Sequence, residues 1–532
     1  MTTFGRLDAP VDNIDPSSAM ARQTCSILYS KPKEAMADGG ESEPNCFHDL
    51  LLDQVFSSIN KDRNDYQLLP FFYDHLHDAD EIRFRYEVWR DLENQALTSS
   101  IRTFESQMLE VRQRLAWSAK SSFVQHRRAL HLDAAHRYCN AVASLVRVLK
   151  ETEINSAALM GFRESLNAYA SSSPFEQLAS ATSLLKDQLS QVRYCINLKG
   201  LHVRVVKYEG EEDYGAEIIK TFERFQQSTV KDYRRSISDW PNMNHVEAMI
   251  VDRVALLFSD LFSSIESFCE QESDFLNRTV TLFEREIQFY LSYLDFIAPL
   301  KAQGLSFCIP EILETSKEIS AVETFDLALA HKLELQRMVV VRNDLHLEGI
   351  ERIIVVSGPN QGGKTTFART FGQIHYLASI GCLVPGQQAQ LYLYDQLYTH
   401  FGKEEDPTYQ SGKLEEDLIR IRAVLNQATS NSIIIMNEIF ASTTALDALG
   451  LGLKVIDKIQ NLDALCVVVT FIDELSRIGP WVVSMTSTVN PTNPADRTFK
   501  IVRQPADGLA YALAIAQKYQ LTYDDIRGRL KS

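Results

Sequence analysis

The sequence lacks the cysteine patterns that mark disulfide scaffolds and zinc modules. Its eight cysteines are scattered singly, without a C-x-x-C pair or a cysteine and histidine cluster at zinc-binding spacing. They are Cys25, Cys46, Cys139, Cys195, Cys269, Cys308, Cys382 and Cys466. This scatter excludes a small disulfide-rich secreted domain and predicts reduced thiols in a cytoplasmic protein.

Long apolar runs and an export signal are also lacking. No stretch of about 18 apolar residues occurs, so we expect no segment that spans a membrane. The opening residues MTTFGRLDAPVDNID contain no basic segment followed by an apolar one, so no secretory signal is expected. The composition, 45% hydrophobic and 23% charged, excludes a collagenous or wholly disordered chain. A length of 532 residues suits about two to four domains.

Positive charge is in short supply. Lysine and arginine number 54 against 70 aspartates and glutamates, which gives a net charge of −16 and a pI of about 5.3. This balance excludes a chain coated with basic charge, the usual property of a non-specific nucleic-acid binder. Residues 341–532 hold 18 basic and 20 acidic residues, so −14 of the −16 lies upstream. The upstream part is therefore acidic, and the C-terminal third is nearly neutral.

The pattern along the chain divides it into three parts. Residues 1–45 are rich in Asp, Pro, Ser and Gly and are predicted to form a poorly ordered tail. Residues 46–304 are mostly helical, and the clearest helix has an apolar stripe at 101, 104, 108, 111 and 115. Alternation of period two predicts a small β hairpin near 191–220. One long, aromatic-rich helical region is expected from about 245 to 302, a length that suits lever-like helices.

Residues 305–532 are predicted to form an α/β domain. Apolar runs such as MVVVRNDLHL, ERIIVVSG, SIIIMNEI and LCVVVTF alternate with helical segments. This alternation indicates a parallel sheet covered by helices on both faces. The predicted fold class is therefore α+β and multidomain, with a mostly helical N-terminal region followed by a C-terminal α/β domain.

The strongest motif is GPNQGGKTT, which satisfies the G-x-x-x-x-G-K-[ST] pattern between a strand and a helix. Its glycines let backbone N–H groups point at phosphate oxygens, and the helix N-terminus favours the same anion. Lys364 can reach the β- and γ-phosphates, and the Thr365 hydroxyl can bind Mg²⁺. The predicted ATP-binding residues are Gly358, Pro359, Asn360, Gln361, Gly362, Gly363, Lys364, Thr365 and Thr366.

A second motif, SIIIMNEIFAS, places Asn437 and Glu438 at the end of an apolar strand. Phosphate-transfer enzymes carry a metal-associated acid at such a position, followed by a base that orients the attacking water. Here the first position is an amide, which brings no charge. We predict that Thr365 and Asn437 hold the Mg²⁺ and that Glu438 and Lys364 are catalytic.

These motifs resemble the ATPase domain of the MutS DNA mismatch-repair proteins. GPNQGGKTT is similar to that family's variant of the loop, and HYLASIGCLVPG, at 375–386, is similar to its helix and turn. NDLHL, at 343–347, resembles the strand before the loop, and NEIFASTTALDALGLG resembles a further block, with Asp447 on an acidic position. The resemblance covers roughly 335–515, and the upstream helices resemble the family's core and lever domains more loosely.

The resemblance implies an ABC-type P-loop ATPase in 305–532 and a core and lever region in 46–304. It also implies a homodimer with composite ATP sites, and DNA held by lever and clamp helices. The sequence departs from the family at Asn437, where the family has Asp, and at Phe471, where a His follows the residue matching Thr470. Gly412, beside Ser411, stands where the family has its signature serine. No Phe-x-Glu mismatch-reading motif is seen, so we expect a shortened, divergent member.

Two functions are compatible with these observations. The first is a MutS-like, Mg²⁺-dependent ATPase acting on DNA, in mismatch repair or in recognition of mismatched and irregular DNA, with turnover that Asn437 and Phe471 can slow. The alternative is an ATP-dependent scaffold or switch that binds protein partners and not DNA. The basic spots His126-Arg127-Arg128 and Arg234-Arg235 match solvated helix faces better than phosphate contacts.

Overall fold

The computed structural model describes residues 25–31, 42–200, 202–211, 243–402, 412–490, 493–506, 521–523 and 526–527. It divides into two compact units, one built on Arg90–Glu284 and the other on Ile27–Trp89 together with Arg285–Ser532. Most of the predicted tail, and the pair Arg234-Arg235, lie outside the described residues. The domain limits at 45 and 304 stay a prediction, because a unit that is compact in space can be assembled from separate stretches of chain.

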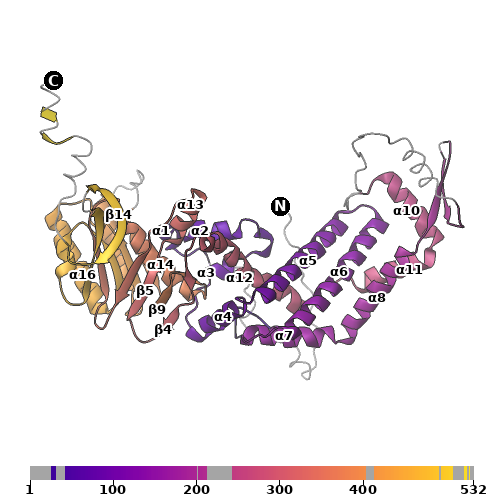
Figure 1. Ribbon diagram of the computed structural model, residues 1–532, viewed down its shortest axis with the longest axis horizontal. Coiled ribbons are helices and arrows are strands. Elements are labelled where there is room, and N and C mark those ends of the chain that lie inside the picture. The colour runs from indigo at the N-terminus through magenta and orange to yellow at the C-terminus, as the bar shows by residue number, and fades with distance from the viewer. Residues whose placement is uncertain are drawn as a thin grey trace. The chain divides into compact units, whose positions relative to one another are not determined.

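The first unit is mostly helical (Figure 1). The side chains of Asn94, Ser156 and Ser172 accept hydrogen bonds from backbone N–H groups in the first turns of three of its helices. Its helices are α5 (Gln95–Lys120), α6 (Val124–Glu151), α7 (Ala157–Ala170), α8 (Ser173–Ser190), α10 (His245–Leu257) and α11 (Ser259–Gln271). The predicted hairpin is present as β1 (Tyr194–Lys199) and β2 (His202–Lys207).

The apolar stripe predicted at 101–115 lies on α5, which packs along α6. Ile101, Phe104, Met108 and Val111 are buried, and Leu115 is partly buried. The helical period therefore predicted both the helix and the face that it packs.

The single helical region expected from 245 to 302 is wrong in its continuity. The structure has α10, α11 and then α12 (Arg278–Ala302). The first break is at Phe258, whose backbone leaves the helical region at φ −121° and ψ 47°. Before α12, the Asn277 side chain accepts a hydrogen bond from Thr279 N at 2.9 Å. Neither break contains Gly or Pro, so the ordinary signals for the end of a helix are lacking there.

A six-stranded sheet forms the centre of the second unit, in the order β10-β11-β12-β7-β13-β14. Its first five strands are parallel, and β14 pairs antiparallel with β13. All residues of β7 and β12 are buried. The strands are β7 (Ile353–Ser357), β10 (Leu397–Phe401), β11 (Ile433–Asn437), β12 (Leu465–Val469), β13 (Val482–Asn490) and β14 (Asn493–Arg503). The parallel sheet expected from the apolar runs is confirmed, and the antiparallel edge strand adds to it.

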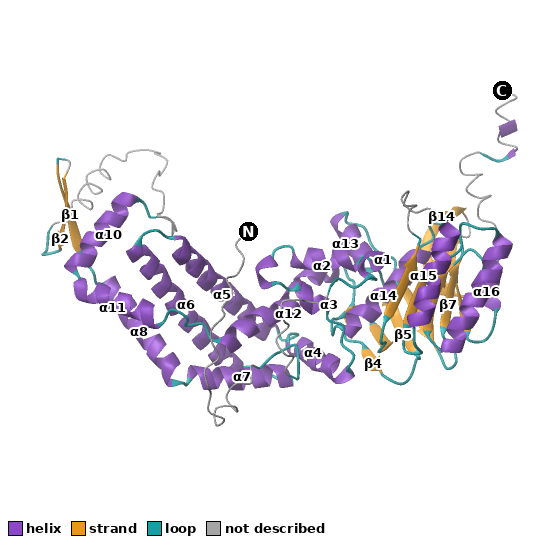
Figure 2. Cartoon of the chain, turned by 180° about the vertical axis from the view of Figure 1, so that it is seen from behind, coloured by secondary structure: helices purple, strands orange, loops and turns teal. Residues whose placement is uncertain are grey.

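Helices cover both faces of this sheet, as the sequence predicted (Figure 2). On one face, α15 (Lys413–Gln427) and α16 (Ala445–Leu462) pack against alternate strand residues, among them Val355 and Met436. On the other face lies α14 (Lys364–Ser379). Its Gly372 approaches the sheet so closely that an added Cβ would lie 2.8 Å from Ile435 Cδ1.

The remaining elements of the second unit are short. The predicted strand MVVVRNDLHL forms only at Asn343–Leu347 (β6), in a separate sheet ordered β4-β9-β5-β6. The other strands are β3 (Phe307–Cys308), β4 (Glu311–Leu313), β5 (Ile319–Thr324), β8 (Val384–Pro385) and β9 (Gln388–Tyr392). The other helices are α1 (Phe47–Leu50), α2 (Leu52–Asn60), α3 (Leu69–Tyr73), α4 (Ala79–Asp91) and α13 (Leu327–Leu335). Across the described ranges, no helix is both long and apolar enough to cross a membrane.

The C-terminal end of α14 is held by α4. Three buried side chains of α4 donate hydrogen bonds to carbonyl oxygens at that end. Arg85 Nη1 donates to Ile380 O at 2.7 Å, Tyr86 Oη to Ala378 O at 3.1 Å and Trp89 Nε1 to Gly381 O at 2.7 Å. These bonds satisfy carbonyl groups that a helix end leaves without intrahelical partners.

Candidate nucleotide-binding site

The loop between β7 and α14 has the backbone of an anion cradle. Gly358 and Gly363 have φ values of 113° and 92°, which glycine adopts without strain. Between them Gln361 has a φ of 59°, an uncommon conformation for a residue with a side chain. Backbone that turns through left-handed positions makes a concave array of N–H groups, and α14 begins directly after it.

Strand β13 contacts this loop through Ser487. The Ser487 hydroxyl donates a hydrogen bond to Gly362 O at 2.7 Å. A Cβ added at Gly362 would lie 2.2 Å from Ser487 Oγ, and one added at Gly358 would lie 3.0 Å from Ser487 O. Both glycines are therefore required by contact with β13, and Gly358 is required by its backbone conformation as well. Sequence reasoning missed Ser487, because a lone serine in a strand carries no motif signal.

This contact predicts the effect of Gly362→Ala. The variant should weaken nucleotide binding at least about tenfold while the protein stays folded, because the new methyl group displaces the loop from Ser487. Isothermal titration calorimetry and circular dichroism measure the two properties. Gly450→Ala on α16 is the matched control, since a Cβ there meets no atom within 4 Å. Ser487→Gly should partly restore binding to Gly362→Ala, and a lack of any rescue would contradict the assigned contact.

Lys364 folds back over the loop. Its ammonium donates hydrogen bonds to Gly358 O at 2.8 Å and Pro359 O at 3.0 Å. The residue is only 4% exposed. Burial lowers the pKa of the Lys364 ammonium, and the nearby Glu438 carboxylate opposes that shift. The ring centroid of Phe471 lies 4.6 Å from Lys364 Nζ.

The two predicted metal-binding side chains lie together. Thr365 Oγ1 donates a hydrogen bond to Asn437 Oδ1 at 2.9 Å. Both groups offer neutral oxygen atoms, the kind of donor that Mg²⁺ accepts. Within the part of the chain that the structure describes, no group of three or more His, Cys, Asp or Glu side chains is arranged to hold a metal. The donors therefore suit an Mg²⁺ that arrives with nucleotide phosphates and keeps several waters, rather than a free-standing metal site.

Glu438 follows β11 in a left-handed conformation, with a φ of 56°. Its backbone N–H donates to Val469 O at 2.9 Å, which fixes the turn against β12. The carboxyl group is partly buried and lies close enough to Lys364 to affect its pKa. A residue held in a sparsely populated conformation at a strand end is a frequent feature of functional sites.

The remaining predicted ATP-binding residues differ in how exposed they are to solvent. Pro359 is buried, whereas Asn360 and Gln361 are exposed on the outer turn of the loop. Thr366 lies in the first turn of α14, where its carbonyl oxygen accepts a hydrogen bond from Thr370 Oγ1 at 2.9 Å. Phe499 of β14, which the sequence did not single out, lies beside Gly363, with its carbonyl oxygen 3.6 Å from the place of an added Cβ.

A parallel sheet with a glycine-rich loop leading from a central strand into a helix is an α/β arrangement typical of P-loop domains. The family model described as MutS domain V matches residues 354–522, which include this loop. Residues 354–522 therefore belong to the MutS domain V family.

Curated relatives agree with this assignment. The DNA mismatch repair protein MutS of Petrotoga mobilis is 24% identical over 43% of this chain and 27% of its own length. Msh2 of Dictyostelium discoideum is 24% identical over 64% of this chain and 38% of its own. MutS of Prochlorococcus marinus is 28% identical over 36% of this chain and 21% of its own length. The chain thus spans between about a fifth and two fifths of the length of these relatives.

Proposed function

We propose that this chain binds ATP with Mg²⁺ at the loop between β7 and α14, hydrolyses it, and acts on DNA in mismatch repair or on mismatched and irregular DNA. The observation that carries the nucleotide part is the convergence of the loop, Lys364, the Thr365–Asn437 pair and Glu438 at one edge of the sheet. The family membership carries the DNA part.

In this proposal each side chain has a definite task. Backbone N–H groups of the loop and the ammonium of Lys364 bind the β- and γ-phosphates. Thr365 and Asn437 present oxygen atoms to the Mg²⁺, which when bound supplies positive charge against the phosphate oxygens. Glu438 accepts a proton from the attacking water and orients it. The neutral Asn437 and the Phe471 ring favour slow turnover, since Asn437 lacks the charge of the family's Asp and Phe471 lacks the hydrogen-bond donor of the family's His.

The hairpin of β1 and β2 supports contact with a nucleic-acid backbone. Between Arg193 and Tyr208 the chain carries four basic residues and no acidic one, although the upstream part as a whole is strongly acidic. The pairs Asn197↔Arg204 and Lys199↔His202 place three of these basic side chains, with Asn197, exposed on one face of the ribbon, whereas Lys207 lies on the other face. A basic, polar face of this kind matches the charge of phosphates. By contrast, Arg128 of the basic spot on α6 pairs with Glu266.

Replacing Lys199 and Arg204 with alanine tests this contact. The double variant should bind duplex DNA more weakly and should reduce the slope of log affinity against log salt by about 2, because each lost phosphate contact removes about 0.9. Fluorescence anisotropy across a salt series, with and without ATP, measures both values. Lys120→Ala with Lys150→Ala, two exposed lysines on α5 and α6, is the matched control. An unchanged slope in the hairpin variant would show that the hairpin does not contact DNA.

The proposal includes a homodimer in which a second copy completes each ATP site. Gly412 begins α15 as its N-terminal cap residue, and the neighbouring Ser411 lies outside the described residues. The support for a dimer is the family membership, since composite sites are what the resemblance implies.

The alternative, an ATP-dependent scaffold or switch that binds protein, is favoured by the other face of the same hairpin. Tyr194, Ile196, Leu198 and Val203 are exposed there, and Leu198 is 75% exposed. Exposed apolar groups of this size suit a protein partner better than a phosphate backbone. Absence of DNA binding at low salt in every nucleotide state would favour this alternative over the first proposal.

A further inference from the structure

The residue after β12 places an aromatic ring on the phosphate-binding lysine. Thr470 is buried, and its N–H donates to Val356 O at 3.1 Å. Its Oγ1 accepts a hydrogen bond from Ile472 N at 3.0 Å. The backbone is therefore anchored before and after Phe471, while the Phe471 side chain is 48% exposed.

The ammonium of Lys364 contacts two loop carbonyl groups and the Phe471 ring. An ammonium has three N–H donors. Two of the donors bond to Gly358 O and Pro359 O, and the Phe471 ring faces Nζ at 4.6 Å, a distance typical of a cation–π contact. Gly358 and Pro359 belong to the loop itself, whereas the ring comes from the residue that follows Thr470, so the ring is the contact of Nζ that lies outside the loop. In the protein without nucleotide, the positive charge of Lys364 is therefore already in contact with groups of the protein itself.

The terminal phosphate competes with the ring more than the others do. The loop backbone and Lys364 bind the β- and γ-phosphates, and the γ-phosphate, as the terminal group, lies closer to the ends of the neighbouring strands. Glu438 follows β11 and Phe471 lies just beyond β12, both at that edge of the sheet. A nucleoside diphosphate reaches less far toward this edge.

We propose that Phe471 is a specificity-determining cap on Lys364, which a nucleoside triphosphate must displace and which lowers affinity for ATP relative to ADP. This inference rests on the proposed nucleotide site. The ring contact stabilises Lys364 in the nucleotide-free protein. Breaking this contact on binding therefore costs free energy and lowers the affinity for the nucleotide. A cation–π contact at a partly exposed site corresponds to a change of about two- to fivefold in affinity.

The test measures ATP-analogue and ADP affinities of the full chain by isothermal titration calorimetry. Phe471→Ala should bind a non-hydrolysable ATP analogue about two- to fivefold more tightly, with a smaller gain for ADP. Phe471→Leu keeps an apolar side chain without a π face and should gain in the same direction. Phe471→Tyr keeps the ring and should retain the wild-type ratio of the two affinities. Leu335→Ala, an exposed apolar side chain of α13, is the control that changes neither affinity.

The outcomes separate this inference from the proposed function. If the wild type binds nucleotide and Phe471→Ala binds the analogue equally or more weakly, the cap is wrong while the nucleotide site stands. If neither protein binds nucleotide, both the site and the cap are wrong. If only Phe471→Ala binds, the cap is supported in its strongest form.

Discussion

Lys364→Ala is expected to abolish nucleotide binding under ordinary assay conditions, with a loss on the order of 100-fold or more. The ammonium bonds directly to the loop, through Gly358 O and Pro359 O. Removing it deprives the phosphates of their counter-charge and the two carbonyl oxygens of their donor. Equilibrium binding of a fluorescent ATP analogue measures the loss.

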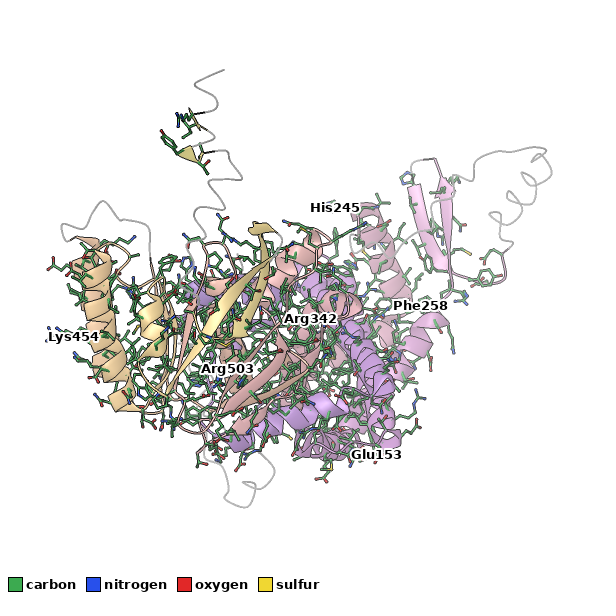
Figure 3. All side chains as sticks on the ribbon, turned by 60° about the vertical axis from the view of Figure 1, so that its left-hand side comes forward. Glu153, His245, Phe258, Arg342, Lys454 and Arg503 are labelled. Carbon is green, nitrogen blue, oxygen red and sulfur yellow. The ribbon has the colours of Figure 1, made fainter. Side chains whose placement is uncertain are left out.

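The side chain is buried, so the binding defect must be separated from a folding defect. Lys364→Met keeps the apolar stem and removes only the charge, and it should lose binding to a similar extent while its thermal unfolding stays close to that of the wild type. Lys454→Ala removes an exposed lysine of α16 (Figure 3) and should bind normally. Retained affinity in Lys364→Met would refute the assignment of Lys364 to the phosphates.

Glu438→Gln is expected to leave ATP binding nearly intact and to lower the turnover rate by about 100- to 10,000-fold. Glutamine keeps the size of the side chain and can follow the same turn after β11, but it cannot accept a proton from water. Phosphate release under ATP saturation measures turnover, and calorimetry measures binding.

A second acidic residue serves as the matched control for this variant. Glu474→Gln changes an exposed carboxyl in the short 3-10 helix Asp473–Arg477 and should leave both binding and turnover unchanged. Normal turnover in Glu438→Gln would show that another group activates the water, and Glu438 would then lose its assigned role.

The sequence predicted the parts of the site that are contiguous in the chain. The glycine-rich loop, the strand before it and the helix after it are local, so residue type and spacing were enough. The hydrogen bond between Thr365 and Asn437 joins two predicted motifs, and its formation follows from the meeting of strand ends at one edge of a parallel sheet. The contacts of Ser487 and Phe499 with the loop depend on the order of strands, which apolar runs do not encode.

For the fold, too, the sequence predicted local features and not the contacts between distant parts of the chain. Fully apolar runs indicated buried parallel strands, and the period of α5 indicated its packed face. The membership of Ile27–Trp89 in the same compact unit as the sheet could not be predicted, because it depends on contacts between residues some 300 positions apart, such as Arg85 with Ile380. The break at Phe258 was missed because a single backbone rotation there leaves no compositional trace.

Helix α14 is held by hydrogen bonds at both of its ends. Its first residue is Lys364, and its last turn is gripped by the three side chains of α4. Sixteen helical residues make a rod of about 24 Å that is buried along most of its length. A helix fixed in this way links the position of the loop to that of α4. The chain runs on from α4 to α5 within a few residues, so the loop is separated from the first helix of the helical unit by only two helices and a short connection.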